Sequence, residues 1–478
     1  ARHAASVSFQ AALRVLKREN FLNQTGASLQ ALRIGNSFLL PARLRKKELR
    51  DMERNARFPS PVRRPEIMAP AGDFVCLSAA LQSGADAAYF GIKGSNMRAG
   101  ARNFDVSDLP RIADECHKRG AKAYLALNNI YFDSEAATLD LHVRAARDAG
   151  VDAVIAWDFA AIERALGAGL EVFLSTQAGV ANSDGVCAYF RRFGIRRFVL
   201  ARECALEDIA SIKRLAAEKI GAENAAKIEI EVFAHGAMCV SISGRCFMSQ
   251  YAYGKSANRG ECLQPCRREY SVREKRENGA EFAVGEGFVM SPKDLCTLPF
   301  IEKLFEAGAD ALKIEGRNRN AQYVSAAAGA YRAARDFWFE RRGESGFSEK
   351  FAELKKSQLE RLSQNFNRGF SDGFYMGRPA GDWTSSGNRA TVKKLILGRV
   401  RNYFPRAGAA EITVDDNSAK IGDTLCVEGN ATGYVEFELE SAQIGGADAG
   451  EVRKGQTASI KVPSKMRPND RIYLLSKS

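Results

Sequence analysis

The 478-residue chain has no long uncharged apolar run and contains few histidines. No stretch approaches the roughly eighteen apolar residues that a membrane-spanning helix requires, so we expect no membrane-spanning segment. The four histidines are His3, His117, His142 and His235, and the sequence His-Glu-x-x-His does not occur. A zinc protease helix of that type is therefore excluded, and a serine or cysteine protease would have to take its base from this small set.

Three of these histidines are poor candidates for catalysis. His3 lies in a basic arm, and His117 and His142 fall within predicted helices, where surface positions are usual. His235 follows a predicted strand and is the one candidate catalytic histidine.

Positive charge is concentrated in the first part of the chain. The net charge is +13, and residues 1–64 contain fourteen Lys and Arg but only four acidic residues. A basic arm can bind phosphates through counterion release, but a solvated surface helix has the same composition. The acid-poor opening also resembles a transit peptide. Because residues 36–55 read as a short strand and a helix, we favour a basic N-terminal extension over 1–63 that is a remnant of another domain.

A repeated pattern over residues 64–345 indicates an α/β fold. A helix ends in glycine, and a short apolar run that ends in polar residues follows, which is typical of successive βα units. About eight or nine strands in this span favour a (β/α)8-type barrel, although the number also fits an open doubly wound sheet. The pattern recurs after Gly84, Gly120, Gly150, Gly169, Gly194 and Gly308, and PEIMAPAG, KIEIEVFAHG and GFVMSPKD add three expected strands.

Polar residues stand where the predicted strands end. In a (β/α)8 barrel the chemistry takes place at the carboxyl ends of the strands, so these side chains predict a single polar mouth. They are Asn128, Asn129, Asp158, Ser175, Thr176, Gln177, Arg202, Glu203, His235, Lys293, Asp294, Lys313, Glu315 and Arg317.

The last part of the chain has a different pattern. We expect a linker and loop-rich segment over residues 346–388. Residues 389–478 contain short alternating runs separated by Gly and Asp turns, which predict a small antiparallel β-barrel domain. Such a domain suits binding of RNA or a protein, but it equally suits a passive lid.

Four of the ten cysteines fall within twenty-eight residues, at the spacing C-x6-C, fifteen residues, C-x3-C. They are Cys239, Cys246, Cys262 and Cys266. A structural zinc site, a pair of disulfides or buried thiols, and an iron–sulfur cluster all remain open. Zinc sites usually show tighter cysteine pairs, whereas wide glycine-containing intervals suit a cluster. The other six cysteines are isolated, which indicates a reducing, cytoplasmic compartment.

Residues 231–249, EVFAHGAMCVSISGRCFMS, resemble the signature of the collagenase-like proteins, peptidase family thirty-two of the unassigned catalytic type. The resemblance continues through PEIMAPAG, AAYFG, STQ, LARE, NRGECLQPCRREY, SPKDLC and LKIEGR and covers roughly residues 64–378. The terminal β-barrel also resembles that of family members. The family name implies proteolysis, but the residues offer no convincing protease machinery.

Better-understood relatives of this family are implicated in oxygen-independent hydroxylation of a tRNA wobble uridine, of ribosomal RNA or of a quinone precursor. The resemblance implies that prephenate is the oxygen source and that Cys239, Cys246, Cys262 and Cys266 bind a [4Fe–4S] cluster. The tRNA type fits best, because no long domain separates the barrel from the terminal domain. The resemblance therefore implies tRNA or another RNA as partner. A collagenase-like endopeptidase and a zinc-stabilised RNA-binding module remain alternatives.

Several arginines are candidates for binding a small dicarboxylate such as prephenate. Carboxylates are best bound by the forked guanidinium group, and Arg98, Arg202 and Arg317 are available. They equally suit salt bridges with Glu203 or Glu315.

Asn128, Gln177 and Lys313 are candidates for orienting a substrate by hydrogen bonds. Residues 1–58 lie upstream of the usual family start and resemble the tail of an extra domain in longer, ribosomal-RNA-type members. The choice of RNA therefore stays open, and the sequence does not predict the oligomeric state.

Overall fold

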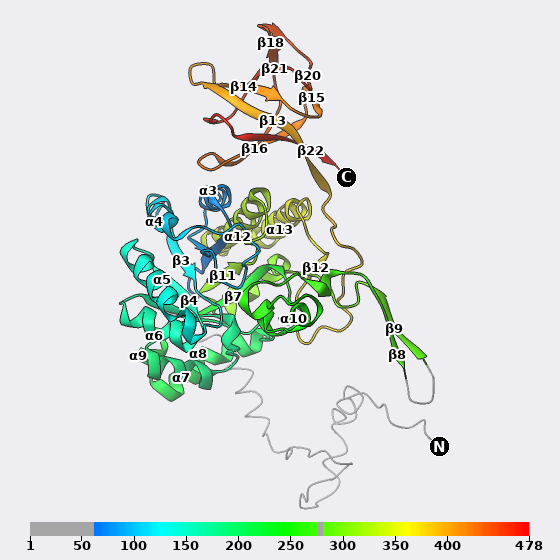
Figure 1. Ribbon diagram of the computed structural model, residues 1–478. Helices are drawn as coiled ribbons and strands as arrows, with labels where there is room; N and C mark the ends of the chain where they lie inside the picture. Colours follow the sequence, from blue (N-terminus) through cyan, green and yellow to red (C-terminus); the bar gives the residue numbers. More distant parts are fainter. Residues whose placement is uncertain (1–61, 276–280, 478) are drawn as a thin grey trace, which may run out of the picture. The chain divides into compact units, whose positions relative to one another are not determined.

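The computed structural model describes residues 62–275 and 281–477 (Figure 1). The basic extension predicted over 1–63 lies outside these residues except for its last two positions. Within the described part of the chain, no helix combines the length and the apolar character needed to cross a membrane.

Eight parallel strands form a closed barrel, so the predicted (β/α)8 fold is confirmed and the open sheet is excluded. Each ring strand pairs with the next in chain order, and the eighth, β11, pairs with both β7 and β1. The ring consists of β1 (Glu66–Ala71), β2 (Ala87–Phe90), β3 (Lys122–Ala126), β4 (Ala153–Ala156), β5 (Glu171–Leu174), β6 (Arg197–Val199), β7 (Glu229–Ala237) and β11 (Ala311–Ile314).

Helices cover the outside of the ring (Figure 1). They bury the apolar outer face of the strands in one large core that includes Ile67, Phe90, Leu125 and Phe198. The helices of this region are α3 (Phe74–Gln82), α4 (Leu109–His117), α5 (Ala136–Asp148), α6 (Phe159–Gly167), α7 (Ser183–Phe193), α8 (Leu206–Ile220), α9 (Ala222–Ala225), α11 (Ile301–Glu306) and α12 (Ala321–Arg341).

Individual residues fix where the helices begin and end. The Asp73 carboxylate accepts a hydrogen bond of 2.8 Å from the backbone N–H of Cys76 and caps α3, and Asp158 caps α6 in the same way. All six glycines that the sequence pattern singled out have φ between +68° and +87°. Glycine adopts this left-handed conformation without a steric penalty, so the predicted helix ends are confirmed.

The interior of the ring contains an ionic network as well as apolar side chains. Arg197 contacts Glu66 at 2.6 Å and Glu229 at 2.7 Å, and Lys313 contacts Glu231 at 2.8 Å. A small buried cluster that includes Tyr89, Tyr124, Ile155 and Phe173 fills the space between these charges. This packed layer forms the floor beneath the carboxyl ends of the strands.

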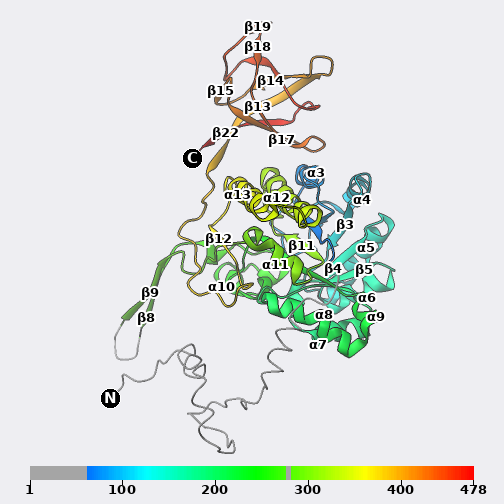
Figure 2. The ribbon, with the colours of Figure 1, turned by 180° about the vertical axis from the view of Figure 1, so that it is seen from behind.

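The segment GFVMSPKD does not supply a ring strand, so this expectation was wrong. Residues up to Gly287 belong to β9 (Glu281–Gly287), which forms a hairpin with β8 (Tyr270–Lys275). The hairpin projects away from the barrel in both views (Figure 1, Figure 2). The next strand, β10 (Asp294–Cys296), pairs antiparallel with β7 outside the ring. A short apolar run cannot by itself reveal its pairing partner.

The segment 346–388 is only partly loop. It begins with α13 (Phe347–Ser363), a helix of seventeen residues, and continues through β12 (Phe370–Ser371) to irregular chain. Stacked rings of Phe337 and Phe351, with centroids 5.8 Å apart, attach α13 to α12. The expectation of a linker overlooked this helix because most of its surface is charged.

The C-terminal part is antiparallel, as predicted. Its strands follow the order β17-β16-β22-β13-β14-β21-β18-β19, and no pairing between the described strands closes this sheet into a ring. Its members are β13 (Val392–Phe404), β14 (Ala409–Val414), β16 (Thr424–Gly429), β17 (Gly433–Glu438), β18 (Ala442–Ile444), β19 (Ala447–Asp448), β21 (Thr457–Lys461) and β22 (Arg471–Lys477), with β15 (Ser418–Lys420) and β20 (Glu451–Arg453) as a separate pair.

Candidate functional site

One cavity opens at the carboxyl ends of the barrel strands. All four clustered cysteines line it, together with most of the polar strand ends that the sequence predicted. The predicted site residues that line it are Arg98, Asn128, Gln177, Arg202, Cys239, Cys246, Cys262, Cys266, Lys313, Glu315 and Arg317. Residues more than two hundred positions apart in the sequence therefore meet in a single site.

The cysteines come from one segment, residues 238–269, which we call the cysteine loop. It follows β7 and contains the short helix α10 (Met248–Tyr253). Two residues of this loop have an unusual backbone conformation: φ is +47° at Ser243 and +54° at Gln264. Such strain in residues other than glycine is often found at functional sites.

The two strained residues line the cavity. The Ser243 hydroxyl lies 2.9 Å from that of Thr176 at the end of β5, which fastens the loop to the barrel. The backbone N–H of Gln264 points to the sulfur of Cys262 at 3.4 Å, and the N–H of Met248 points to the sulfur of Cys246 at the same distance.

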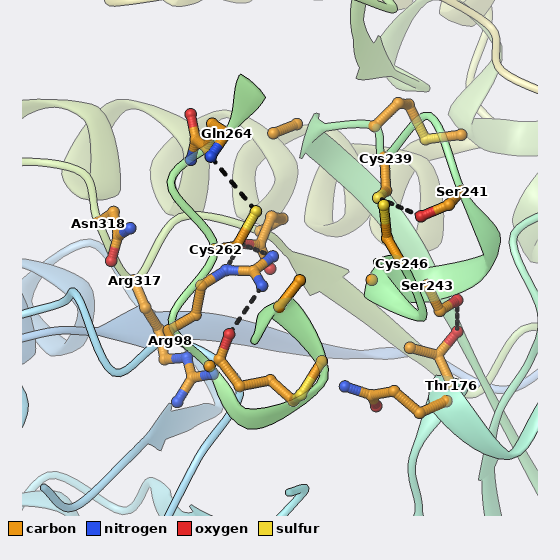
Figure 3. A pocket seen from close by; sticks show the side chains of 18 of the residues that line it. Arg98, Thr176, Cys239, Ser241, Ser243, Cys246, Cys262, Gln264, Arg317 and Asn318 are labelled. Carbon is orange, nitrogen blue, oxygen red and sulfur yellow. Dashed lines mark hydrogen bonds and ion pairs between the residues drawn. The ribbon is translucent and has the colours of Figure 1, made fainter. Parts of the chain in front are cut away.

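The cysteine side chains influence one another across the cavity. Burial raises the pKa of the Cys266 thiol to about 11, and the nearby thiols of Cys239, Cys246 and Cys262 add to this effect. Burial also disfavours the Cys239 thiolate, but hydrogen bonds from Ser241 and nearby arginines outweigh it and lower the pKa. In Figure 3 the sulfur atoms of Cys239 and Cys246 point toward each other.

The four thiols are the soft metal-ligand donors of the cavity. Among residues 62–275 and 281–477, no three His, Cys, Asp or Glu side chains are placed to hold one ion. In a tetrahedral zinc site the sulfur atoms lie only about 3.8 Å apart, as a Zn–S distance of about 2.3 Å requires. Thiolate sulfur is a ligand both of zinc and of iron–sulfur groups, so the four donors alone fit either.

Three guanidinium groups and one carboxylate form a charged cluster beside the cysteines. Arg98 contacts the carboxylate of Glu315 through Nε at 3.3 Å and Nη2 at 3.1 Å. Arg317 donates from Nη1 to Oδ1 of Asn96 at 3.0 Å, and Arg202 donates to the backbone carbonyl of Ala237 at 2.6 Å. Figure 3 shows Arg98 and Arg317 entering the same region of the cavity.

Two hydrogen-bond donors of this cluster have no acceptor among the described residues. The Nε atoms of Arg202 and Arg317 are buried and have no hydrogen-bond partner. A buried unpaired donor is costly, which favours a site that a ligand completes.

The charges of the cluster are strongly coupled. Burial alone would raise the pKa of Glu315, but Arg98, Arg202 and Arg317 outweigh it and lower the pKa to about 2. Glu315 in turn raises the pKa of Arg98, whereas burial lowers the pKa of Arg317 to about 10. At neutral pH the cluster therefore holds three positive charges and one negative charge.

The remaining predicted substrate-binding residues lie on the cavity wall. Asn128 is 8% exposed, and its side-chain oxygen accepts a hydrogen bond of 3.2 Å from the backbone N–H of Met97, so its amide donor is the group left for a ligand. The Gln177 side-chain oxygen is bonded to the Ser175 hydroxyl. Lys313 is paired with Glu231 and lies 4.5 Å from the centre of the Tyr89 ring.

His235 lies outside the cavity, which corrects its prediction as a catalytic residue. Lys313 and Phe233 are paired across β11 and β7, but the next pair is Ile314 with His235, so Ala234 is an extra residue. This β-bulge turns His235 outward, between the rings of Tyr323, Tyr331 and Phe370. Burial there lowers its pKa to about 3.

Glu203 is the other proposed substrate-binding residue that does not line the cavity. Of the predicted polar mouth, Asn129, Asp158, Lys293 and Asp294 do not line it either. Glu203 is exposed on the loop after β6, whereas its neighbour Arg202 turns inward over the Phe233 ring at 3.8 Å. The sequence interpretation also missed Tyr89, Asn318, Arg319 and Arg368, all of which line the cavity. The polar run RNRN after the last ring strand was a usable signal for Asn318 and Arg319.

Comparison with known proteins gives a match to one family model and several similar relatives. The model of peptidase family U32 matches residues 72–385. A protein of Porphyromonas gingivalis named collagenase is 38% identical over 415 residues, which cover 86% of this chain and 98% of the relative.

Two other relatives are named for RNA modification. A tRNA hydroxylation protein of Bacillus subtilis is 34% identical over 347 residues, or 71% of this chain and 78% of the relative. A 23S rRNA 5-hydroxycytidine synthase of Escherichia coli is 31% identical over 320 residues, or 66% of this chain and 46% of the relative. The resemblance noted in the sequence is thus confirmed, and the chain belongs to peptidase family U32.

Proposed function

We propose that this protein is an iron–sulfur-dependent enzyme that hydroxylates a pyrimidine of tRNA or ribosomal RNA without molecular oxygen. The observation that carries the proposal is the meeting of four cysteines and a cationic cluster in one cavity at the carboxyl ends of the barrel strands. The names of two relatives add support for RNA hydroxylation as the reaction class.

Cys239, Cys246, Cys262 and Cys266 would hold a [4Fe–4S] cluster. Such a cluster supplies redox and Lewis-acid chemistry that amino-acid side chains lack, and hydroxylation of a ring carbon requires chemistry of this kind. The backbone N–H groups of Met248 and Gln264 point to the sulfur atoms of Cys246 and Cys262, each at 3.4 Å.

The charged cluster fits a small dicarboxylate such as prephenate as the source of the hydroxyl group. The guanidinium groups of Arg98, Arg202 and Arg317, offset by the Glu315 carboxylate, leave a net charge of two positive. A dicarboxylate carries two negative charges, and the unpaired Nε donors of Arg202 and Arg317 can serve its oxygens. Binding of the dianion would therefore neutralise the cluster.

Proteolysis is the second candidate, because a relative with 38% identity is named collagenase. Peptide hydrolysis by a serine or cysteine nucleophile needs a base beside it. No histidine of the described residues lines the cavity, and His235 is buried among aromatic rings away from it. This geometry favours the hydroxylation proposal.

The experiment is nucleoside analysis by mass spectrometry of tRNA and ribosomal RNA from a strain that lacks the gene. We expect one hydroxylated pyrimidine to disappear and to return with the wild-type gene but not with a Cys262→Ser variant. Unchanged RNA, together with peptide cleavage that survives Cys262→Ser and Cys266→Ser, would instead establish a peptidase.

A further inference from the structure

Three exposed aromatic side chains lie on the cysteine loop beside the cavity. Phe247, Tyr251 and Tyr253, which we call the aromatic strip, are 61%, 87% and 39% exposed. The ring centroids of Phe247 and Tyr251 lie 6.0 Å apart across one turn of α10. Single exposed apolar residues are common, but three large rings within seven residues mark a binding surface.

The strip is physically joined to the cavity. Phe247 directly follows Cys246, and its neighbours Met248 and Ser249 line the cavity. The Ser249 hydroxyl accepts a hydrogen bond of 3.0 Å from the backbone N–H of Leu263, next to Cys262. This short segment therefore presents Met248 and Ser249 to the cavity and aromatic rings to solvent.

Positive charge accompanies the rings. The Arg268 guanidinium lies 4.9 Å from the centre of the Tyr253 ring, and Arg245 lies 5.4 Å from that of Trp157. Both arginines are exposed, and neither forms an ion pair with a carboxylate within the described ranges 62–275 and 281–477. The whole cysteine loop contains five basic and two acidic residues.

Aromatic rings and arginines that have no carboxylate partner together match the chemistry of single-stranded nucleic acid. Every base has a flat π face that stacks on aromatic side chains, and every phosphate attracts a guanidinium group. A base that enters the cavity must first leave the stack of its neighbours, which costs free energy. Aromatic rings at the entrance can restore stacking for the neighbouring bases.

We propose that the aromatic strip stacks the nucleotides that flank the target base in a single-stranded RNA segment. This inference rests on the proposed function and deepens it, because it assigns the surface that recognises the RNA outside the cavity. A protein partner, such as an electron carrier, is the rival occupant of the strip.

The test compares the binding of a short fluorescein-labelled oligouridylate to variants of the full chain by fluorescence anisotropy under anaerobic conditions. We expect Phe247→Ala with Tyr251→Ala to weaken binding at least about tenfold. The conservative pair Phe247→Tyr and Tyr251→Phe should retain it. Phe404→Ala, which removes a 40% exposed ring from the C-terminal sheet, is the matched control and should have no effect.

Salt dependence separates stacking from charge. The double alanine variant should keep the wild-type slope of log K against log salt, because the removed rings are uncharged. Arg245→Ala with Arg268→Ala should reduce the slope by about one to two. Equal affinity of the double alanine variant and the wild type would overturn the inference.

Iron and sulfide content of each variant keeps the two proposals distinguishable. If the double alanine variant loses iron, Tyr251→Ala alone carries the test, because an 87% exposed ring contributes little to folding. If the wild type binds and hydroxylates RNA but the strip variants bind equally well, only the strip assignment fails. If the strip variants bind RNA as well as the wild type does but no longer hydroxylate it when a protein supplies the electrons, the strip is a protein-docking surface and the inference is wrong. If the wild type shows no RNA binding, the proposed function itself fails.

Discussion

Replacing Glu315 with glutamine should lower the free energy of unfolding by about 3 kcal/mol at neutral pH. The side chain is 13% exposed and lies against Arg98. The fall of its pKa from 4.5 to about 2 means that the folded protein favours the carboxylate by about 3 kcal/mol, at about 1.4 kcal/mol per unit. Breaking a buried ion pair commonly costs a similar amount, about 3–5 kcal/mol.

The pH dependence of this effect has a definite sign. The unfolded chain binds the proton of Glu315 more readily than the folded protein, because the folded pKa is lower. The stabilisation is therefore fully present above pH 4.5 and is lost as the pH falls from 4.5 toward 2. The difference between wild type and Glu315→Gln should shrink over that window.

Urea denaturation followed by circular dichroism, under anaerobic conditions, measures both effects. Glu203→Gln is the matched control, because this carboxylate is exposed near the same end of the barrel, and it should change stability by less than about 0.5 kcal/mol. If Glu315→Gln proves as stable as the control at every pH, Glu315 does not neutralise the arginines. The assigned net charge of the cluster would then be wrong.

Three further predictions concern neighbouring residues. Urea unfolding at a series of pH values should show that the free energy of unfolding of the wild type falls as the pH drops from 6.5 toward 3, by up to about 1.4 kcal/mol per pH unit. The cause is that His235 is protonated in the unfolded chain but not in the folded protein. The His235→Phe variant should show a smaller pH slope and should still hydroxylate RNA. Gly236→Ala should lower the free energy of unfolding, measured by urea denaturation, by about 2 kcal/mol or more, because the φ of Gly236 is +105° and the new Cβ would lie 2.4 Å from the Glu315 carbonyl oxygen. In the control Gly167→Ala the new Cβ meets open space, so stability should not change. Arg317→Lys should weaken the binding of malonate, measured by calorimetry, about tenfold, because lysine lacks the forked donor pair; unchanged affinity would remove Arg317 from the anion site.

Features encoded by neighbouring residues were predictable from the sequence. The repeated glycine after each helix and the apolar run that follows it identified the ring strands, since both are local signals. Most of the polar residues at the strand ends also converge as expected, because parallel strands bring their carboxyl ends to one side of the barrel.

Features set by strand pairing were not predictable. A single extra residue, Ala234, decides that His235 faces aromatic rings outside the ring of strands, and no local pattern marks a bulge. Arg202 and Glu203 are adjacent polar residues in the turn after β6, and the sequence pattern does not distinguish which of them enters the cavity. The position of GFVMSPKD outside the barrel depends likewise on an antiparallel partner in β7.

Anaerobic purification with iron and acid-labile sulfide analysis tests the central claim most directly. We predict a brown protein with about four iron and four sulfide per chain and a broad absorbance near 400 nm that bleaches on reduction. Cys262→Ser with Cys266→Ser should lose both elements, whereas Cys187→Ser, a change to a buried cysteine outside the cysteine loop, should retain them. A colourless wild-type protein without iron and sulfide, or one with stoichiometric zinc, would contradict the account.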